Sequence, residues 1–149
     1  MSLQEELKAL KQRIAELEEL AKEEQKFPQV EDDYWYVDGD AEVMLSVWYG
    51  DDYDKGRLSI DNVLKTKGQA DFAAKKLRVE AELRKYGRPF MWGTGNTAML
   101  FDGDNIKFDT RLSHVFQGAI YFESENKAKE AIKSVGEERI KKYLFGVEG

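Results

Sequence analysis

Two stretches of the chain resemble each other, and this internal repeat limits what the chain can fold into. The segment 61–66 is matched by the segment 119–124, which lies 58 positions further on, and each precedes a run with alanines at corresponding positions. Upstream, the Asp-Gly-Asp triplet at 38–40 resembles the one at 102–104, at a slightly different offset. Such self-similarity predicts that one supersecondary unit occurs twice.

The composition fits one globular domain with an appendage. With 149 residues, 42% of them hydrophobic, the chain is long enough to bury a core. The net charge of −6 argues against nonspecific binding to a nucleic acid duplex, which needs a basic surface. The absence of cysteine excludes disulfides and thiolate chemistry, and no run is apolar and long enough for a membrane span. We therefore expect a cytoplasmic protein without membrane contact.

The first 27 residues have the pattern of a coiled-coil helix. From Leu3 to Lys26 there is no glycine or proline, and strong helix formers predominate. Apolar residues recur in alternating steps of four and three, which is the a/d seam of a coiled coil. The predicted seam consists of Leu3, Leu7, Leu10, Ile14, Leu17 and Ala21.

The charges beside this seam favour parallel association into a dimer or trimer. Pairing Glu6 with Lys11, and Arg13 with Glu18, across neighbouring helices brings opposite charges together, although each pair contributes only a few tenths of a kcal/mol. The alternative is an amphipathic helix that docks on its own chain. A linker over 28–33 follows, because Pro28 ends the helix and an acidic run comes next.

The remaining residues, 34–149, predict a duplicated α+β domain with repeats at about 34–87 and 88–149. In the first repeat we expect strands over 34–37, 41–49 and within 57–64, a polar loop over 50–56, and a helix from Thr66 to about Gly87. In the second we expect strands near 90–92, 98–101, 106–112 and 117–122, then helices over 125–135 and 137–144. The fold class is thus α+β, in which an N-terminal coiled-coil helix precedes two antiparallel strand–helix units.

The helix of the first repeat has two apolar stripes on opposite sides. One is rich in alanine and suits close packing on a sheet, and the other consists of Phe72, Val79, Leu83 and Tyr86. A helix that is apolar on two faces must be covered on both. The second stripe is therefore either buried by this chain or its copies, or it is a surface for a protein partner.

No residue pattern identifies a reaction. His114 is the only histidine, its neighbour Ser113 would point to the opposite face of a strand, and without cysteine a zinc site lacks ligands. The Asp-Gly-Asp triplets lack the spacing of a calcium loop and indicate hairpin turns. The glycines of segment 93–96 do not precede a helix, so a turn is expected there and not a phosphate cradle. We expect no catalytic residue, no metal site and no cofactor.

Aromatic residues of the first repeat suggest a binding surface. Trp35, Trp48 and Tyr49 are candidate partner-binding residues, and with the nearby lysines and arginine they raise the alternative of a stacking platform for single-stranded nucleic acid or a nucleotide. Strand alternation places Trp35 on the face opposite Tyr34 and Tyr36, so part of this cluster is expected in the core. A nucleic acid partner is therefore not the leading expectation.

The chain also resembles a known group of proteins. The phrase 61–67, followed by Ala70 and the run 76–79, is similar to one that recurs in small proteins of phages and prophages of Gram-positive bacteria, which carry glycine where this chain has Asp61 and phenylalanine where it has Leu64. Segments 120–124, 131–132 and 135–143 resemble the second half of those proteins. The resemblance implies an accessory protein in the host cytoplasm that binds a host or phage protein, and it brings no catalytic residues.

The residues and the resemblance together predict a non-enzymatic, oligomeric binding protein. Its partners are expected to be further copies of itself, in a parallel dimer or trimer, and a protein of unknown identity.

Overall fold

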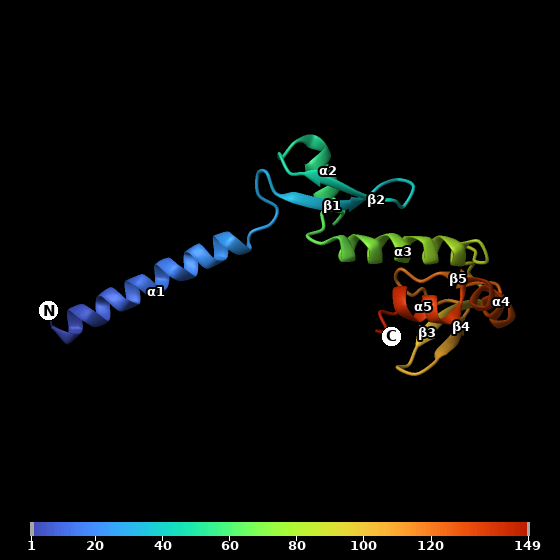
Figure 1. Ribbon diagram of the computed structural model, residues 1–149. Coiled ribbons are helices and arrows are strands. Elements are labelled where there is room, and N and C mark those ends of the chain that lie inside the picture. Colours follow the sequence, from blue (N-terminus) through green and yellow to red (C-terminus); the bar gives the residue numbers. More distant parts are fainter. Residues whose placement is uncertain (1, 149) are drawn as a thin grey trace. The chain divides into compact units, whose positions relative to one another are not determined.

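The computed structural model describes residues 2–148 and contains helices and two small antiparallel sheets, as the α+β prediction expects (Figure 1). Helix α1 spans Leu3–Gln25 and is followed by strands β1 (Asp33–Val37) and β2 (Val43–Val47), which form a two-stranded sheet. Helices α2 (Asp52–Ser59) and α3 (Lys67–Arg84) come next. Among residues 2–148, no helix combines the length and the apolar character that crossing a bilayer requires.

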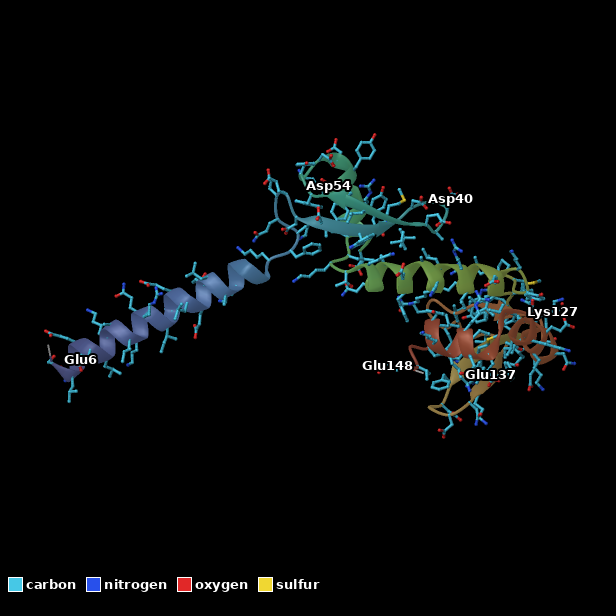
Figure 2. All side chains as sticks on the ribbon, viewed as in Figure 1. Glu6, Asp40, Asp54, Lys127, Glu137 and Glu148 are labelled. Carbon is cyan, nitrogen blue, oxygen red and sulfur yellow. The ribbon has the colours of Figure 1, made fainter. Side chains whose placement is uncertain are left out.

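The second half of the chain forms a three-stranded sheet with two helices. Strands β3 (Asn96–Phe101), β4 (Ile106–Arg111) and β5 (Tyr121–Phe122) are arranged in the order β4-β3-β5. Helices α4 (Glu125–Val135) and α5 (Glu137–Tyr143) follow, and polar side chains such as Lys127 and Glu137 lie on their outer surface (Figure 2). The expected strand near 90–92 is wrong, because this stretch is irregular, and the expected strand over 117–122 shrinks to its last two residues.

The strands of the two halves pair in a similar order. In the second half, β3 pairs antiparallel with β4 on one side and with β5 on the other. In the first half, β1 is the neighbour of β2 and also forms an antiparallel bridge through Trp35 to Leu64. Leu64, the residue bridged to β1, precedes helix α3, and strand β5 precedes helix α4. This order of pairing is compatible with the predicted duplication. The duplication itself remains a prediction.

Both hairpins turn at an aspartate, as their sequences predict. The Asp38 Oδ1 atom accepts hydrogen bonds from the backbone N–H groups of Asp40 and Glu42, each at 2.9 Å. The Asp102 Oδ1 atom accepts from Asp104 and Asn105 at 2.9 and 2.8 Å, and these N–H groups hold the pKa of Asp102 below its usual range. Short polar side chains that bind their own turn in this way explain the Asp-Gly-Asp triplets without a calcium ion.

The chain divides into two compact units, one built from residues up to 36 with 44–66 and the other from 37–43 with 67–149. Helix α3 therefore belongs to the second unit, whereas the predicted repeats divide at 87. The reason is its second apolar stripe, because Val79 and Leu83 are fully buried in a core with Phe122, Ala128 and Ile140. This is the burial within the same chain that the sequence left as one of two alternatives.

The other two members of this stripe, Phe72 and Tyr86, make contacts to α5 and α4 within the same unit. Phe72 packs against Tyr143 with ring centroids 5.2 Å apart, and the Tyr86 hydroxyl donates a hydrogen bond to Ser134 Oγ at 2.7 Å. Val79 and Leu83 leave no accessible surface for a partner, and Phe72 keeps 39% of its surface exposed. The stripe thus acts mainly as core of the second unit.

Candidate functional site

The strongest local constellation lies between β2 and α2, at the start of a helix that the sequence did not predict. Residues 50–56 were expected to form a loop, but α2 begins at Asp52 and its N-cap is Asp51. The Asp51 side chain accepts from the Asp54 N–H at 2.8 Å, and Asp54 accepts from the Asp51 N–H at 3.4 Å. This reciprocal capping box stabilises the first turn of a helix with little apolar character.

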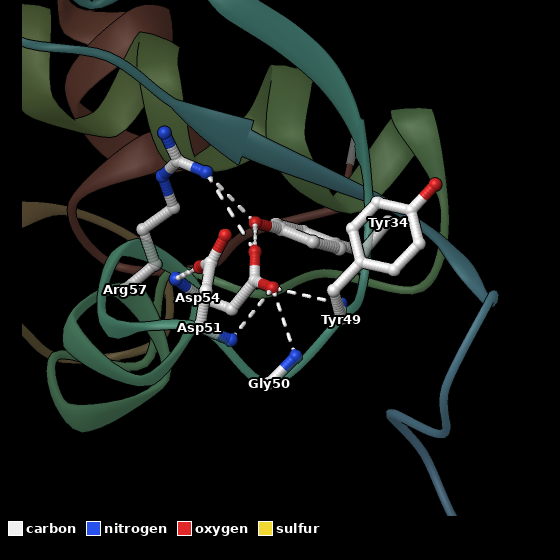
Figure 3. A network of polar contacts seen from close by, with 6 residues as sticks. All are labelled: Tyr34, Tyr49, Gly50, Asp51, Asp54 and Arg57. Atoms are coloured by element: carbon white, nitrogen blue, oxygen red, sulfur yellow. Dashed lines mark hydrogen bonds and ion pairs between the residues drawn. The ribbon is translucent and has the colours of Figure 1, made fainter.

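Asp54 is the centre of a buried polar network (Figure 3). The residue is 2% exposed, and its Oδ1 atom accepts a 2.5 Å hydrogen bond from the Tyr34 hydroxyl of β1. Its Oδ2 atom accepts from the backbone N–H groups of Tyr49 and Gly50 at 2.8 and 3.0 Å. The Arg57 guanidinium donates to the Tyr34 hydroxyl at 2.8 Å and lies 3.7 Å from the centre of the Tyr36 ring.

The network fixes the protonation states of its members. Burial alone would raise the pKa of Asp54, but the hydrogen bonds from Tyr34 and from three backbone N–H groups outweigh it, and the pKa lies below its usual value. Burial and the bond to Asp54 raise the pKa of Tyr34. Asp54 is therefore an anion and Tyr34 a neutral donor near pH 7. Because both carboxylate oxygens of Asp54 are already bound, we assign Asp54 a structural role.

Above this network lies an exposed segment that we call the tyrosine turn, residues 49–53. Tyr49 and Tyr53 are 65% and 77% exposed, and Asp52 between them is also exposed. The backbone beneath is held at three successive N–H groups by one carboxylate. Figure 3 shows the Tyr49 ring projecting away from the network while its N–H faces Asp54. The turn therefore presents two aromatic rings and a carboxylate from an ordered backbone.

The surroundings of the tyrosine turn are acidic. The segments 28–36 and 44–66 of the first unit contain seven Asp and Glu against three Lys and Arg. Exposed apolar side chains add to the same part of the chain: Met44, Leu45, Leu58 and Ile60 are each at least 41% exposed. An acidic surface with aromatic and apolar groups favours a partner that carries positive charge.

The structure does not assemble the aromatic platform that would bind single-stranded nucleic acid. Tyr34 is fully buried, Trp35 and Trp48 are half-buried, and Trp48 meets the Tyr34 ring edge-on with centroids 6.1 Å apart. Of the three candidates Trp35, Trp48 and Tyr49, only Tyr49 projects freely. Tyr53 is the more exposed tyrosine of the turn, and it is not among the residues predicted from the sequence, because a polar loop is expected over 50–56.

The remaining candidates are dispersed. His114 and Ser113 are both exposed, and no group of three or more His, Cys, Asp or Glu side chains within residues 2–22 and 26–148 is placed to hold a metal ion. All six residues of the predicted seam are exposed along α1. The exposed fractions of its leucines and of Ile14 range from 49% at Leu17 to 85% at Leu3. Leu20, which the predicted seam omits, is 51% exposed.

Comparison with known proteins gives no relative from which a function could be transferred. The chain matches no family model, no curated protein and no solved structure.

Proposed function

We propose that this chain is a non-enzymatic, oligomeric binding protein whose tyrosine turn recognises a protein partner through arginine or lysine side chains. The observation that carries the proposal is the pair of exposed tyrosines, Tyr49 and Tyr53, on a turn whose N–H groups are bound by the buried Asp54. An ordered turn loses little conformational entropy on binding, so more of the contact energy appears as affinity.

The chemistry of the turn suits such a partner. Tyrosine is enriched among residues that dominate binding energy, because it offers a large rigid ring together with a polar hydroxyl. The ring faces attract guanidinium or ammonium groups, and the Asp52 carboxylate supplies a charge-assisted acceptor between them. The excess of acidic residues in segments 28–36 and 44–66 repels the phosphates of nucleic acid, so a protein is the better partner.

Oligomerisation through α1 would multiply this surface. The seam residues leave an apolar stripe along a 23-residue helix, and most of the stability of helices in proteins comes from packing such an apolar face. Burying the stripe in a parallel dimer or trimer stabilises α1 and places several tyrosine turns in one assembly. Each additional turn that reaches the same partner raises the overall affinity without new contacts.

A phage or prophage origin, with the protein acting in the cytoplasm of the host cell, accords with the resemblance of segment 61–67. Asp61 has a φ of 58°, in the left-handed region where glycine costs least. This is the position at which the resembling proteins carry glycine. Aspartate, which replaces that glycine here, is one of the few other residue types that adopt the left-handed conformation.

The proposal is tested by affinity capture from infected or lysogenic cells, followed by titration of the purified partner. We expect the wild-type chain to retain a protein partner that a Tyr49→Ala, Tyr53→Ala double variant loses. Trp92→Ala is the matched control, because Trp92 is 69% exposed but belongs to the second unit. A partner that binds the double variant as tightly as the wild type, or that is released by Trp92→Ala alone, would contradict the proposal.

A further inference from the structure

The hydrogen bonds of the Arg88 guanidinium go to neutral acceptors. Its NH1 group donates to the Asn96 side-chain oxygen at 2.8 Å and to the Pro89 carbonyl at 3.1 Å, and its NH2 group donates to the Gly95 carbonyl at 2.6 Å. All of these acceptors are neutral. Among the side chains of residues 2–22 and 26–148, none forms an ion pair with Arg88 at 4.0 Å or less, although Arg88 is half-buried. The bonds tie the loop 89–95 to the first residue of β3 through acceptors that carry no charge.

A hollow of about 420 Å³ adjoins this guanidinium. Its lining includes Arg84, Gly87, Arg88, Phe90, Ile120 and Tyr121, and no Asp or Glu of the described chain contributes to it. Gly87 is required for the close approach of the chain here, since a Cβ atom on it would lie 2.8 Å from the Tyr121 carbonyl oxygen. The volume is that of a small-molecule site.

The second arginine of the hollow, Arg84, forms a surface ion pair. Arg84, in the last turn of α3, lies 3.6 Å from Glu80 and its side chain is 60% exposed, so this surface ion pair contributes little. Another part of the lining is aromatic, and there the Phe90 ring meets the rings of Trp92 and Tyr121 edge-on, at centroid distances of 5.1 and 5.2 Å. One part of the lining is thus cationic and another offers an apolar ring.

We propose that this hollow binds a small organic anion in which a carboxylate or phosphate is attached to a flat apolar group. Arg84 would donate paired N–H groups to the anion, since guanidinium matches the geometry of both oxyanions. Arg88 contributes charge, because its NH1 and NH2 groups are already bound to the loop. Phe90 contacts the flat group. This site lies in the second unit and is independent of the tyrosine turn.

The test is a titration of the full chain, followed by NMR or calorimetry, with phenyl phosphate, benzoate, inorganic phosphate and the neutral benzyl alcohol. We expect at least one aromatic anion to bind at millimolar or lower concentration, and benzyl alcohol and inorganic phosphate to bind more weakly. The preferred aromatic anion distinguishes a phosphate site from a carboxylate site. Equal binding of inorganic phosphate would indicate an adventitious ion only, and equal binding of benzyl alcohol a merely apolar hollow. Either outcome, or no binding at all, overturns the proposal.

Two variants of the same helix sharpen the test. Arg84→Gln removes the exposed guanidinium and should weaken binding of the preferred anion at least about tenfold, the usual loss for a charge-assisted hydrogen bond. Arg78→Gln makes the same change in charge nearly two turns earlier, where the arginine pairs with Glu42 at 3.1 Å outside the hollow, and should leave the affinity unchanged. Equal affinities of the two variants would contradict the assignment even if the anion binds.

Discussion

The Tyr34 hydroxyl donates its hydrogen bond to Asp54 across twenty positions of sequence, and this contact ties β1 to the first turn of α2. A second bond from Arg57 to the same hydroxyl makes Tyr34 both donor and acceptor. The capped turn of α2 and the two-stranded sheet are therefore one polar cluster, and the exposed tyrosines depend on it for their position.

Replacement of Asp54 by asparagine should destabilise the first unit. The asparagine side chain would present one acceptor oxygen in place of two, so either the Tyr34 hydroxyl or the backbone N–H groups of the turn would lose their partner. We expect a loss of about 1–3 kcal/mol in the free energy of unfolding, measured by urea denaturation. Asp52→Asn is the control, because Asp52 is exposed and should change stability by less than about 0.5 kcal/mol.

The Asp54 carboxylate should make the free energy of unfolding depend on pH. The pKa of Asp54 in the folded chain lies below the ordinary value of 3.8, so the stabilisation is complete above that value and is lost as the pH falls through the folded pKa. Urea denaturation of the wild type should therefore show a falling free energy of unfolding below about pH 4. In Asp54→Asn this acid dependence should be smaller, and an identical pH profile in the two proteins would refute the assignment.

Helix α3 carries one buried and one exposed leucine, which allow a matched pair of variants. Leu83 is fully buried among the side chains of α4 and α5, whereas Leu77 on the same helix is 48% exposed. Leu83→Ala should lower the free energy of unfolding by about 2–5 kcal/mol through lost burial and a residual cavity. Leu77→Ala should cost much less. Similar losses in the two variants, measured by thermal or urea denaturation, would mean that Leu83 is not a core residue.

The sequence predicted the elements that rest on a long pattern or on a local turn. The helices α1 and α3 have periodic apolar residues and no internal proline, and the turns at Asp38 and Asp102 follow from short polar side chains that bind neighbouring N–H groups. Helix α2 was missed because it is short, contains Gly56 and has no apolar face. Its one sequence signal is the aspartate three residues after Asp51, which completes the capping box.

The candidate sites were harder to predict, since their partners are distant in sequence. The exposure of Tyr53 follows from α2, and the loop 89–96 is irregular because Asn96 is fully buried and binds Met91, Thr94 and Arg111 through its side-chain amide. Nothing in the local sequence of residues 90–92 indicates that the side chain of the buried Asn96, and not a neighbouring strand, will bind the backbone of this stretch. The apolar and aromatic pattern there is the same as that of a short strand.

The oligomeric state gives the most direct test of α1. Leu10 and Ile14 are 62% and 55% exposed and occupy neighbouring d and a positions of the predicted seam. Leu10→Lys with Ile14→Lys would place charges at the interface, where burial without a partner is costly, so the mass measured by sedimentation should fall to that of one chain. Gln12→Lys with Glu16→Lys adds charge on the same turns but outside the seam and should preserve the oligomer. A wild-type chain that sediments as a monomer, or a seam variant that keeps the wild-type mass, would show that α1 does not join copies through these residues.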